Sequence, residues 1–176
     1  ILVPQGIETN AVKSSWRRLS PHRQPQLVSI PATPTGVEKF LKTWQPQPNP
    51  LPNRPLRILL VGLAGSLSSE YTIGDVVLGR DCICGFANCQ QQPFHWQVTN
   101  ELQNRLSSKP TLVGVFTSHR VISQAAEKQQ LHQRYRCDVV DMEAGVVLPT
   151  LTARNMQVAM LRVIGDDCHQ DLPDLT

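Results

Sequence analysis

The stretch LRILLVGLAG, residues 56–65, decides the fold class predicted for this chain. It is a continuous run of leucine, isoleucine and valine that ends in glycine, which is typical of a β-strand buried on both faces. Such strands occur in parallel sheets, because the crossover helices cover both faces of the sheet. We therefore expect an α/β domain built around a central strand at residues 56–65.

Segments on both sides of this strand alternate between strand and helix patterns. The alternation predicts a three-layer α/β/α domain with a central, mostly parallel mixed sheet. Helices are predicted at 35–44, with Thr35 as the cap, at 125–135 and at 143–155. The predicted strands, besides 56–65, lie at 1–6, 72–79, 111–118, 137–142 and 157–167.

The length and composition of the chain bound its organisation. With 176 residues we expect one domain over 1–176, with a proline-rich connection at about 45–55, QPQPNPLPNRP. A hydrophobic fraction of 40% and a charged fraction of 18% are typical of a globular protein. A net charge of +3 does not favour a nucleic-acid partner, and no apolar run is long enough for a membrane span or a signal peptide. A cytoplasmic protein is the resulting expectation.

Five cysteines leave two interpretations. Cys82, Cys84 and Cys89 could supply three thiolates to a zinc ion, but the paired C-x2-C pattern of structural zinc sites is absent. Free thiols in a reducing compartment are favoured instead. The acidic segment 166–175 with His169 is a second metal candidate, also disfavoured, so we predict neither metal nor cofactor.

Two carboxylates interrupt the apolar stretch DVVDMEAGVV at 138–147. A buried carboxylate costs several kcal/mol unless it is paired or hydrogen-bonded, so Glu143 calls for an explanation. It follows a predicted strand and opens a predicted helix, whose amides could stabilise its charge; the alternative is a glutamate that only caps this helix. If the segment leaves the strand regularly, we expect Asp141 on the face opposite Glu143, in a structural role.

Ligands of open α/β sheets bind beyond the carboxyl ends of the strands. Glu143, Asp166 and the turn GLAGS at 62–66 all occupy such ends. Ala64 and Gly65 in this turn would let backbone amides approach a ligand closely. Asp166 could alternatively be a solvated acidic turn.

Three ordered motifs, VGLAGSL with TIGDVV, VVDMEAG and LRVIGDD, resemble those of the nucleoside phosphorylase and nucleosidase superfamily. The resemblance covers about residues 57–80 and 111–175. It implies a phosphorylase/hydrolase-like fold and an enzyme that cleaves the N-glycosidic bond of a purine-type nucleoside, by phosphate or by water. It also implies a small-molecule nucleoside as partner, no cofactor apart from phosphate as a possible co-substrate, and a homo-oligomer, either a dimer or a trimer of dimers.

The resemblance also implies residue roles. Glu143 would accept hydrogen bonds from the ribose hydroxyls, Met142 would pack against the sugar, and Asp166 would protonate the leaving base. This division suits the chemistry, because cleavage builds positive charge on the sugar and negative charge on the base. The neighbouring charge of Asp167 would favour a protonated Asp166.

Several positions depart from the family pattern. Gly165 replaces a serine, Leu63 a serine or threonine, and Val121 an aromatic residue. Asn10 stands where a water-activating glutamate is expected, with Glu8 close by in a different register. These departures motivate an alternative: a catalytically degenerate member of the fold that binds a nucleoside-like ligand without turnover.

A basic pair, His119 and Arg120, lies in the segment TSHRV. The pair could bind an anion such as phosphate. A surface loop is the favoured interpretation.

Overall fold

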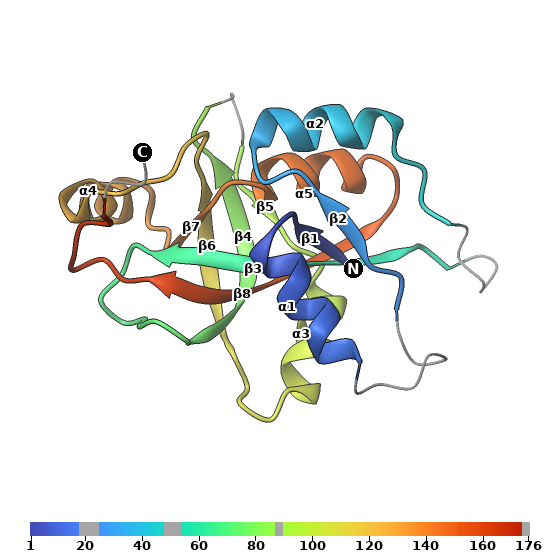
Figure 1. Cartoon of the computed structure of the whole chain (residues 1–176), viewed down its shortest axis with the longest axis horizontal. Coiled ribbons are helices and arrows are strands. Elements are labelled where there is room, and N and C mark those ends of the chain that lie inside the picture. The colour runs from blue at the N-terminus through green and yellow to red at the C-terminus, as the bar shows by residue number, and fades with distance from the viewer. Residues whose placement is uncertain (18–24, 48–53, 87–89, 174–176) are drawn as a thin grey trace.

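A computed structural model describes residues 1–17, 25–47, 54–86 and 90–173. Helices lie on both sides of a central mixed sheet (Figure 1): α2 and α5 on one side, α1 and α3 on the other, with α4 at one end. The helices are α1 Ile7–Trp16, α2 Pro34–Thr43, α3 Trp96–Arg105, α4 Ala125–Tyr135 and α5 Ala144–Thr152. The strands are β1 Leu2–Pro4, β2 Val28–Ile30, β3 Arg57–Ser66, β4 Val76–Cys84, β5 Gln92–Pro93, β6 Thr111–Thr117, β7 Val139–Asp141 and β8 Gln157–Asp166.

The sheet is mostly parallel and partly closes on itself. Five strand pairs are parallel and three are antiparallel. Strand β3 pairs with both β8 and β7, β8 pairs with β4, and β6 joins β4 to β7. These five strands therefore form a closed ring, and β1 and β2 extend it from β3.

The predicted α/β class with a central mixed sheet is confirmed. The apolar run at 56–65 forms β3, and helix α4 has the predicted bounds. The cap of α2 was predicted wrongly. The side chain of Thr33, not Thr35, accepts a hydrogen bond from the Gly36 amide at 3.2 Å, because the helix begins at Pro34, two residues earlier than a cap at Thr35 implies. Of the proline-rich connection at 45–55, residues 48–53 lie outside the described part of the chain.

Helix α5 is buried between α2 and the sheet. Five of its nine residues, Ala144, Gly145, Val147, Leu148 and Leu151, are buried. Val37 and Leu41 of α2 belong to the same apolar core. Because α5 is held on both sides, its N-terminal end has a fixed position at the end of β7.

A register shift at the end of the β3–β8 pair affects the site. Ala64 pairs with Ile164, but Gly65 pairs with Asp166, so Gly165 is an extra residue in β8. A bulge of this kind re-aims the following side chain. Asp166 is therefore placed by the bulge rather than by regular strand alternation.

Two general features of the described residues bear on function. None of their helices has the length and apolar character needed to cross a membrane. No cluster of three or more histidine, cysteine or acidic residues in that part of the chain could hold a metal ion.

Candidate active site

A cavity of about 230 Å³ lies beyond the ends of β3, β7 and β8. All five residues predicted for the site line it, together with Glu8 of α1. The sequence-derived residues are thus brought together in space. They are Ala64, Gly65, Met142, Glu143 and Asp166.

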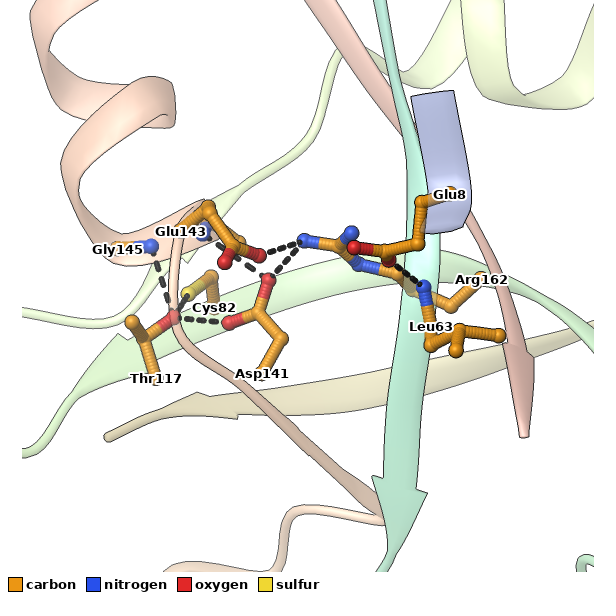
Figure 2. A network of polar contacts seen from close by, with 9 residues as sticks. Glu8, Leu63, Cys82, Thr117, Asp141, Glu143, Gly145 and Arg162 are labelled. Atoms are coloured by element: carbon orange, nitrogen blue, oxygen red, sulfur yellow. Dashed lines mark hydrogen bonds and ion pairs between the residues drawn. The ribbon is translucent and has the colours of Figure 1, made fainter. Parts of the chain in front are cut away.

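Arg162 of β8 lies at the centre of a polar network that includes two carboxylates of the cavity wall, Asp141 and Glu143 (Figure 2). Its side chain is fully buried, and Nη2 donates to Asp141 Oδ2 at 2.5 Å and to Glu143 Oε2 at 2.9 Å. Its Nε and Nη1 are also buried and have no hydrogen-bond partner among the described residues. One guanidinium therefore holds two carboxylates and keeps unused donors.

The prediction that Asp141 lies on the face opposite Glu143 is wrong. Both carboxylates bind the same nitrogen of Arg162, so the two side chains point to the same place. Strand alternation gives no reason for opposite faces, because residues two apart in a strand share a face. Beyond the end of β7 at Asp141, Glu143 occupies the N-cap position of α5 and points to the same guanidinium. The predicted structural role of Asp141 does agree with its contacts: Oδ1 accepts from the Thr117 hydroxyl at 2.6 Å and Oδ2 from the Ala144 amide at 3.0 Å.

The amides at the start of α5 do not bind Glu143. Asp141 takes the amide of Ala144, and the Thr117 hydroxyl accepts from Gly145 at 2.8 Å. The Glu143 side chain makes no capping hydrogen bond, so the interpretation as a helix cap is wrong. Its carboxylate is left for Arg162 and for the cavity.

The pKa of the Glu143 carboxyl is shifted by its burial and by the neighbouring charges of Arg162 and Asp141. Burial raises the pKa of the Glu143 carboxyl to about 7, against the opposing effect of Arg162 and with the charge of Asp141 adding to the rise. Burial alone would lower the pKa of Arg162, but the two carboxylates raise it. The guanidinium therefore remains charged, and Glu143 is the group that titrates near neutral pH.

Glu8 reaches the cavity from α1 and approaches Arg162 across β3 (Figure 2). Its Oε1 accepts a hydrogen bond from the Leu63 amide at 2.5 Å. A Cβ at Gly62 would lie 2.6 Å from this oxygen and 2.1 Å from Arg162 Nη1. The close approach of Glu8 and Arg162 to β3 therefore requires glycine at position 62. Asn10, the residue aligned with the family glutamate, is exposed and does not line the cavity.

Asp166 lines the same cavity but lies outside the Arg162 network, and it has a cation of its own. The ammonium of Lys128 on α4 donates to Asp166 Oδ2 and to the carbonyl oxygen of Asp167. Lys128 is fully buried, whereas the Asp166 side chain is 25% exposed. Asp166 is thus an ion-paired carboxyl rather than a solvated acidic turn.

Of four further positions singled out in the sequence, Leu63, Arg120 and Val121 line the cavity, and His119 does not. Leu63 and Val121 line the cavity with apolar side chains that are 48% and 50% exposed. Arg120 also lines it, but pairs with Glu127 at 2.6 Å. His119 makes an edge-to-face contact with Phe86 instead.

Two thiols of the cysteine cluster are buried in the sheet. Cys82 and Cys84 are free and line a second cavity beside α5, and Cys89 lies outside the described residues. Burial raises the pKa of the Cys82 thiol well above its usual value. Its sulfur lies 3.3 Å from the Thr117 hydroxyl.

Two charged residues of this site had no role in the sequence-based prediction. Arg162 had a usable signal, since it is a lone cation inside the apolar strand pattern QVAMLRVIG. Lys128 had none, because in AAEKQQLHQRY it is indistinguishable from the residues of a solvated helix face.

The chain is an α/β protein whose candidate site lies at the carboxyl ends of its strands and is lined by acidic side chains. A model of the phosphorylase superfamily matches residues 53–175, more than two thirds of the chain. The chain belongs to the phosphorylase superfamily. The prediction of a nucleosidase- or phosphorylase-type enzyme is supported by this membership.

Solved structures agree in fold. The 5'-methylthioadenosine/S-adenosyl homocysteine nucleosidase of Campylobacter jejuni superposes with a TM-score of 0.74 at 14% identity, over 97% of this chain and 87% of that one. Futalosine hydrolase of Helicobacter pylori strain 26695 gives 0.74 at 12% identity, over 95% and 84%. Helicobacter pylori MTAN gives 0.72 at 12% identity, over 94% and 87%. No curated protein is similar enough in sequence to count as a relative.

Proposed function

We propose that this protein hydrolyses the N-glycosidic bond of a purine-type nucleoside. The observation that carries the proposal is the placement of three carboxyl groups, Glu8, Glu143 and Asp166, around one cavity. Each has a different protein partner: the Leu63 amide, Arg162 and Lys128, respectively. Different surroundings let similar groups take different roles in one reaction.

Glu143 holds the sugar in this proposal. One of its oxygens binds Arg162, and the other makes no hydrogen bond with the described part of the chain. An ionised carboxylate at the cavity wall can accept hydrogen bonds from two neighbouring hydroxyls. Met142 lines the cavity beside it and supplies an apolar surface for the sugar ring.

Glu8 activates the attacking water. Its carboxylate lines the cavity, and one of its oxygens accepts a hydrogen bond from the Leu63 amide. A water in the cavity beside the other oxygen would be oriented by it and could pass a proton to Glu8. The missing carboxylate at Asn10 is thus compensated from a position two residues earlier.

Asp166 donates a proton to the departing base. Protonation removes the negative charge that would otherwise build up on the base as its bond to the sugar breaks. The carboxyl lies against Gly65, whose missing side chain lets it approach β3, and its other face meets the cavity.

The charge of the cavity supports water rather than phosphate as the acceptor. Four carboxylates line it, those of Glu8, Asp141, Glu143 and Asp166. The one lining cation among the described residues, Arg120, is paired with Glu127. A phosphate dianion would be repelled by this lining, whereas water would not.

Release of free base from a panel of purine nucleosides, with and without inorganic phosphate, tests this proposal. We expect release without phosphate, and a fall of about 100-fold or more in kcat for Glu8→Gln and for Asp166→Asn. Glu38→Gln, at an exposed salt bridge of α2, is the matched control and should be unaffected. Release that requires phosphate would replace hydrolysis by phosphorolysis.

A member of the fold that binds without turnover is the second candidate. Gly165 and Leu63 support it, because neither offers a hydroxyl where the family usually has one. Measurable nucleoside binding without base release would establish it over hydrolysis.

A homo-oligomer, a dimer or a trimer of dimers, also remains part of the proposal. It is supported by the apolar side chains of Leu63 and Val121, about half exposed at the cavity. Sedimentation of the purified protein would measure it.

A further inference from the structure

Lys128 is a buried cation that has no role in the proposed reaction as described above. It is the buried residue of α4, whose other residues are partly or fully exposed. Removing an ammonium from water costs several kcal/mol, and an apolar side chain of similar size in such a place is often neutral or stabilising. The burial of this lysine is therefore not explained by stability alone.

The contacts of Lys128 are concentrated on Asp166 and its neighbour. Nζ donates to Asp166 Oδ2 and to the carbonyl oxygen of Asp167, so one ammonium fixes both the carboxyl and the following peptide. Gly65 confines the carboxyl on another side, since a Cβ there would lie 2.8 Å from Oδ2 and 3.1 Å from Oδ1. The orientation of Asp166 is thus set by Lys128 and β3 together.

Helix α4 is itself joined to the chain that follows Asp166. The Ala125 amide at its start donates to Asp171 Oδ1 at 2.7 Å, and the Leu172 amide donates to the Ser123 carbonyl at 2.8 Å. With the Lys128 contacts, these bonds connect the first turn of α4 and residues 166–172 at several points. The distance between the ammonium and the carboxyl is therefore fixed by more than the ion pair.

We propose that Lys128 is a positioning residue for the proton transfer from Asp166, holding Oδ2 so that Oδ1 faces the base. The inference rests on the proposed function. Asp166, an ion-paired carboxylate in the free protein, first takes up a proton from solvent. As the C–N bond breaks, its electron pair passes to the base; the O–H bond of Asp166 breaks and a base N–H bond forms. The carboxylate that results is stabilised by the Lys128 ammonium, a charge already in place when the transfer occurs. Water adds to the sugar carbon and its proton passes to Glu8, which completes the balance.

A pair of substrates separates this role from a structural one. A purine nucleoside has a base that needs a proton to leave, whereas p-nitrophenyl riboside releases a stable phenolate without one. In Lys128→Met we expect kcat for the purine nucleoside to fall roughly 100-fold, with KM changed less than about threefold. The rate on p-nitrophenyl riboside should change less than about threefold.

The ratio of the two rates is the decisive measurement. Both rates are taken on one sample, so the ratio does not depend on how much of the variant is folded. Lys39→Met, an exposed lysine on α2, is the matched control and should keep the wild-type ratio. In an Asp166→Asn background, Lys128→Met should cause no further loss, because the two residues act in one step.

A failure of the proposed role of Lys128 can be distinguished from a failure of the proposed hydrolysis. Equal losses on both substrates, or additive losses in the double variant, would overturn the role of Lys128 while leaving hydrolysis intact. If the wild-type protein released neither base nor p-nitrophenol, the proposed function would fall, and the inference with it.

Discussion

The two ends of the cavity solve the same problem, a carboxylate removed from water, in different ways. At the end proposed to hold the sugar, here the sugar end, Asp141 and Glu143 share the single guanidinium of Arg162, and all three side chains are nearly or fully buried. At the end proposed to face the base, here the base end, Asp166 has the ammonium of Lys128 to itself, and its side chain is 25% exposed. One end has an excess carboxylate; the other has a matched pair.

This difference in charge balance assigns different physical properties to the two ends. An excess carboxylate in a buried place is held back from ionisation, which is why the pKa of Glu143 is raised to about 7. The matched pair has no excess charge, and solvent reaches part of it. We therefore expect the sugar end to govern stability and pH response, and the base end to govern the rate of the proton transfer.

Removing the shared cation should have the largest effect. Arg162→Met leaves Asp141 and Glu143 buried without a positive partner, and the loss of one member of a buried charge group typically costs about 3–5 kcal/mol. Urea unfolding of the variant would measure this loss. Lys42→Met, which breaks the exposed pair with Glu38, should cost less than about 1 kcal/mol. Similar costs for the two variants would contradict the distinction between the two ends.

The pH response of the sugar end should be the next largest effect. If Glu143 holds the sugar as proposed, nucleoside binding requires its ionised form, so the association constant should fall as the pH drops below about 7, by about tenfold per pH unit. Calorimetric titration between pH 8 and pH 5 would measure it. Glu143→Gln should bind weakly at every pH in this range; a falling profile that persists in this variant would place the titration elsewhere.

The stability contribution of Glu143 has a defined sign. Its pKa is higher in the folded protein than the usual 4.5, so the folded state holds this proton more tightly than the unfolded chain does. That contribution is fully present below about pH 4.5 and is lost as the pH rises through about 7. Ligand binding and this stability term therefore change in opposite directions over the same range.

The sequence predicted the central strands and the carboxylates at both ends of the cavity, but neither of the cations that pair with them. The apolar runs of β3 and β8 specify buried strands locally, and Glu143 and Asp166 follow strands directly. Both ends could therefore be located from the strand pattern alone. What the pattern omits is which cation meets each carboxylate, because such pairs join segments far apart in the chain.

Elements with weak apolar periodicity were also missed. Helices α1 and α3 bury few residues, Thr9 in the first and Val98 and Thr99 in the second, so no apolar stripe marks them. Glu8 belongs to α1, and its place in the cavity depends on how that helix packs on β1 and β3. Tertiary packing, rather than local sequence, decides its position.

The smallest effect we predict concerns how closely Asp166 fits against β3, and it is tested by substitutions at two glycines, Gly65 and Gly165. In Gly65→Ala the new Cβ would lie 2.8 Å from Asp166 Oδ2, so the carboxyl must move away from β3. In the matched control Gly165→Ala, the nearest atoms are those of Leu63 at 3.7 Å, an ordinary contact distance. Because a small displacement of an acid slows proton transfer, we expect kcat on a purine nucleoside to fall about tenfold in the first variant and less than about twofold in the second.

The displaced atom is the end of a partly exposed side chain, so the thermal midpoint of Gly65→Ala should change little while its rate falls. Steady-state kinetics and thermal unfolding of both variants would measure the two quantities. Equal rates for the two variants would show that Asp166 has freedom to move beside Lys128. The matched pair at the base end would then be a loose contact, and the contrast with the buried network around Arg162 would be one of solvent exposure alone.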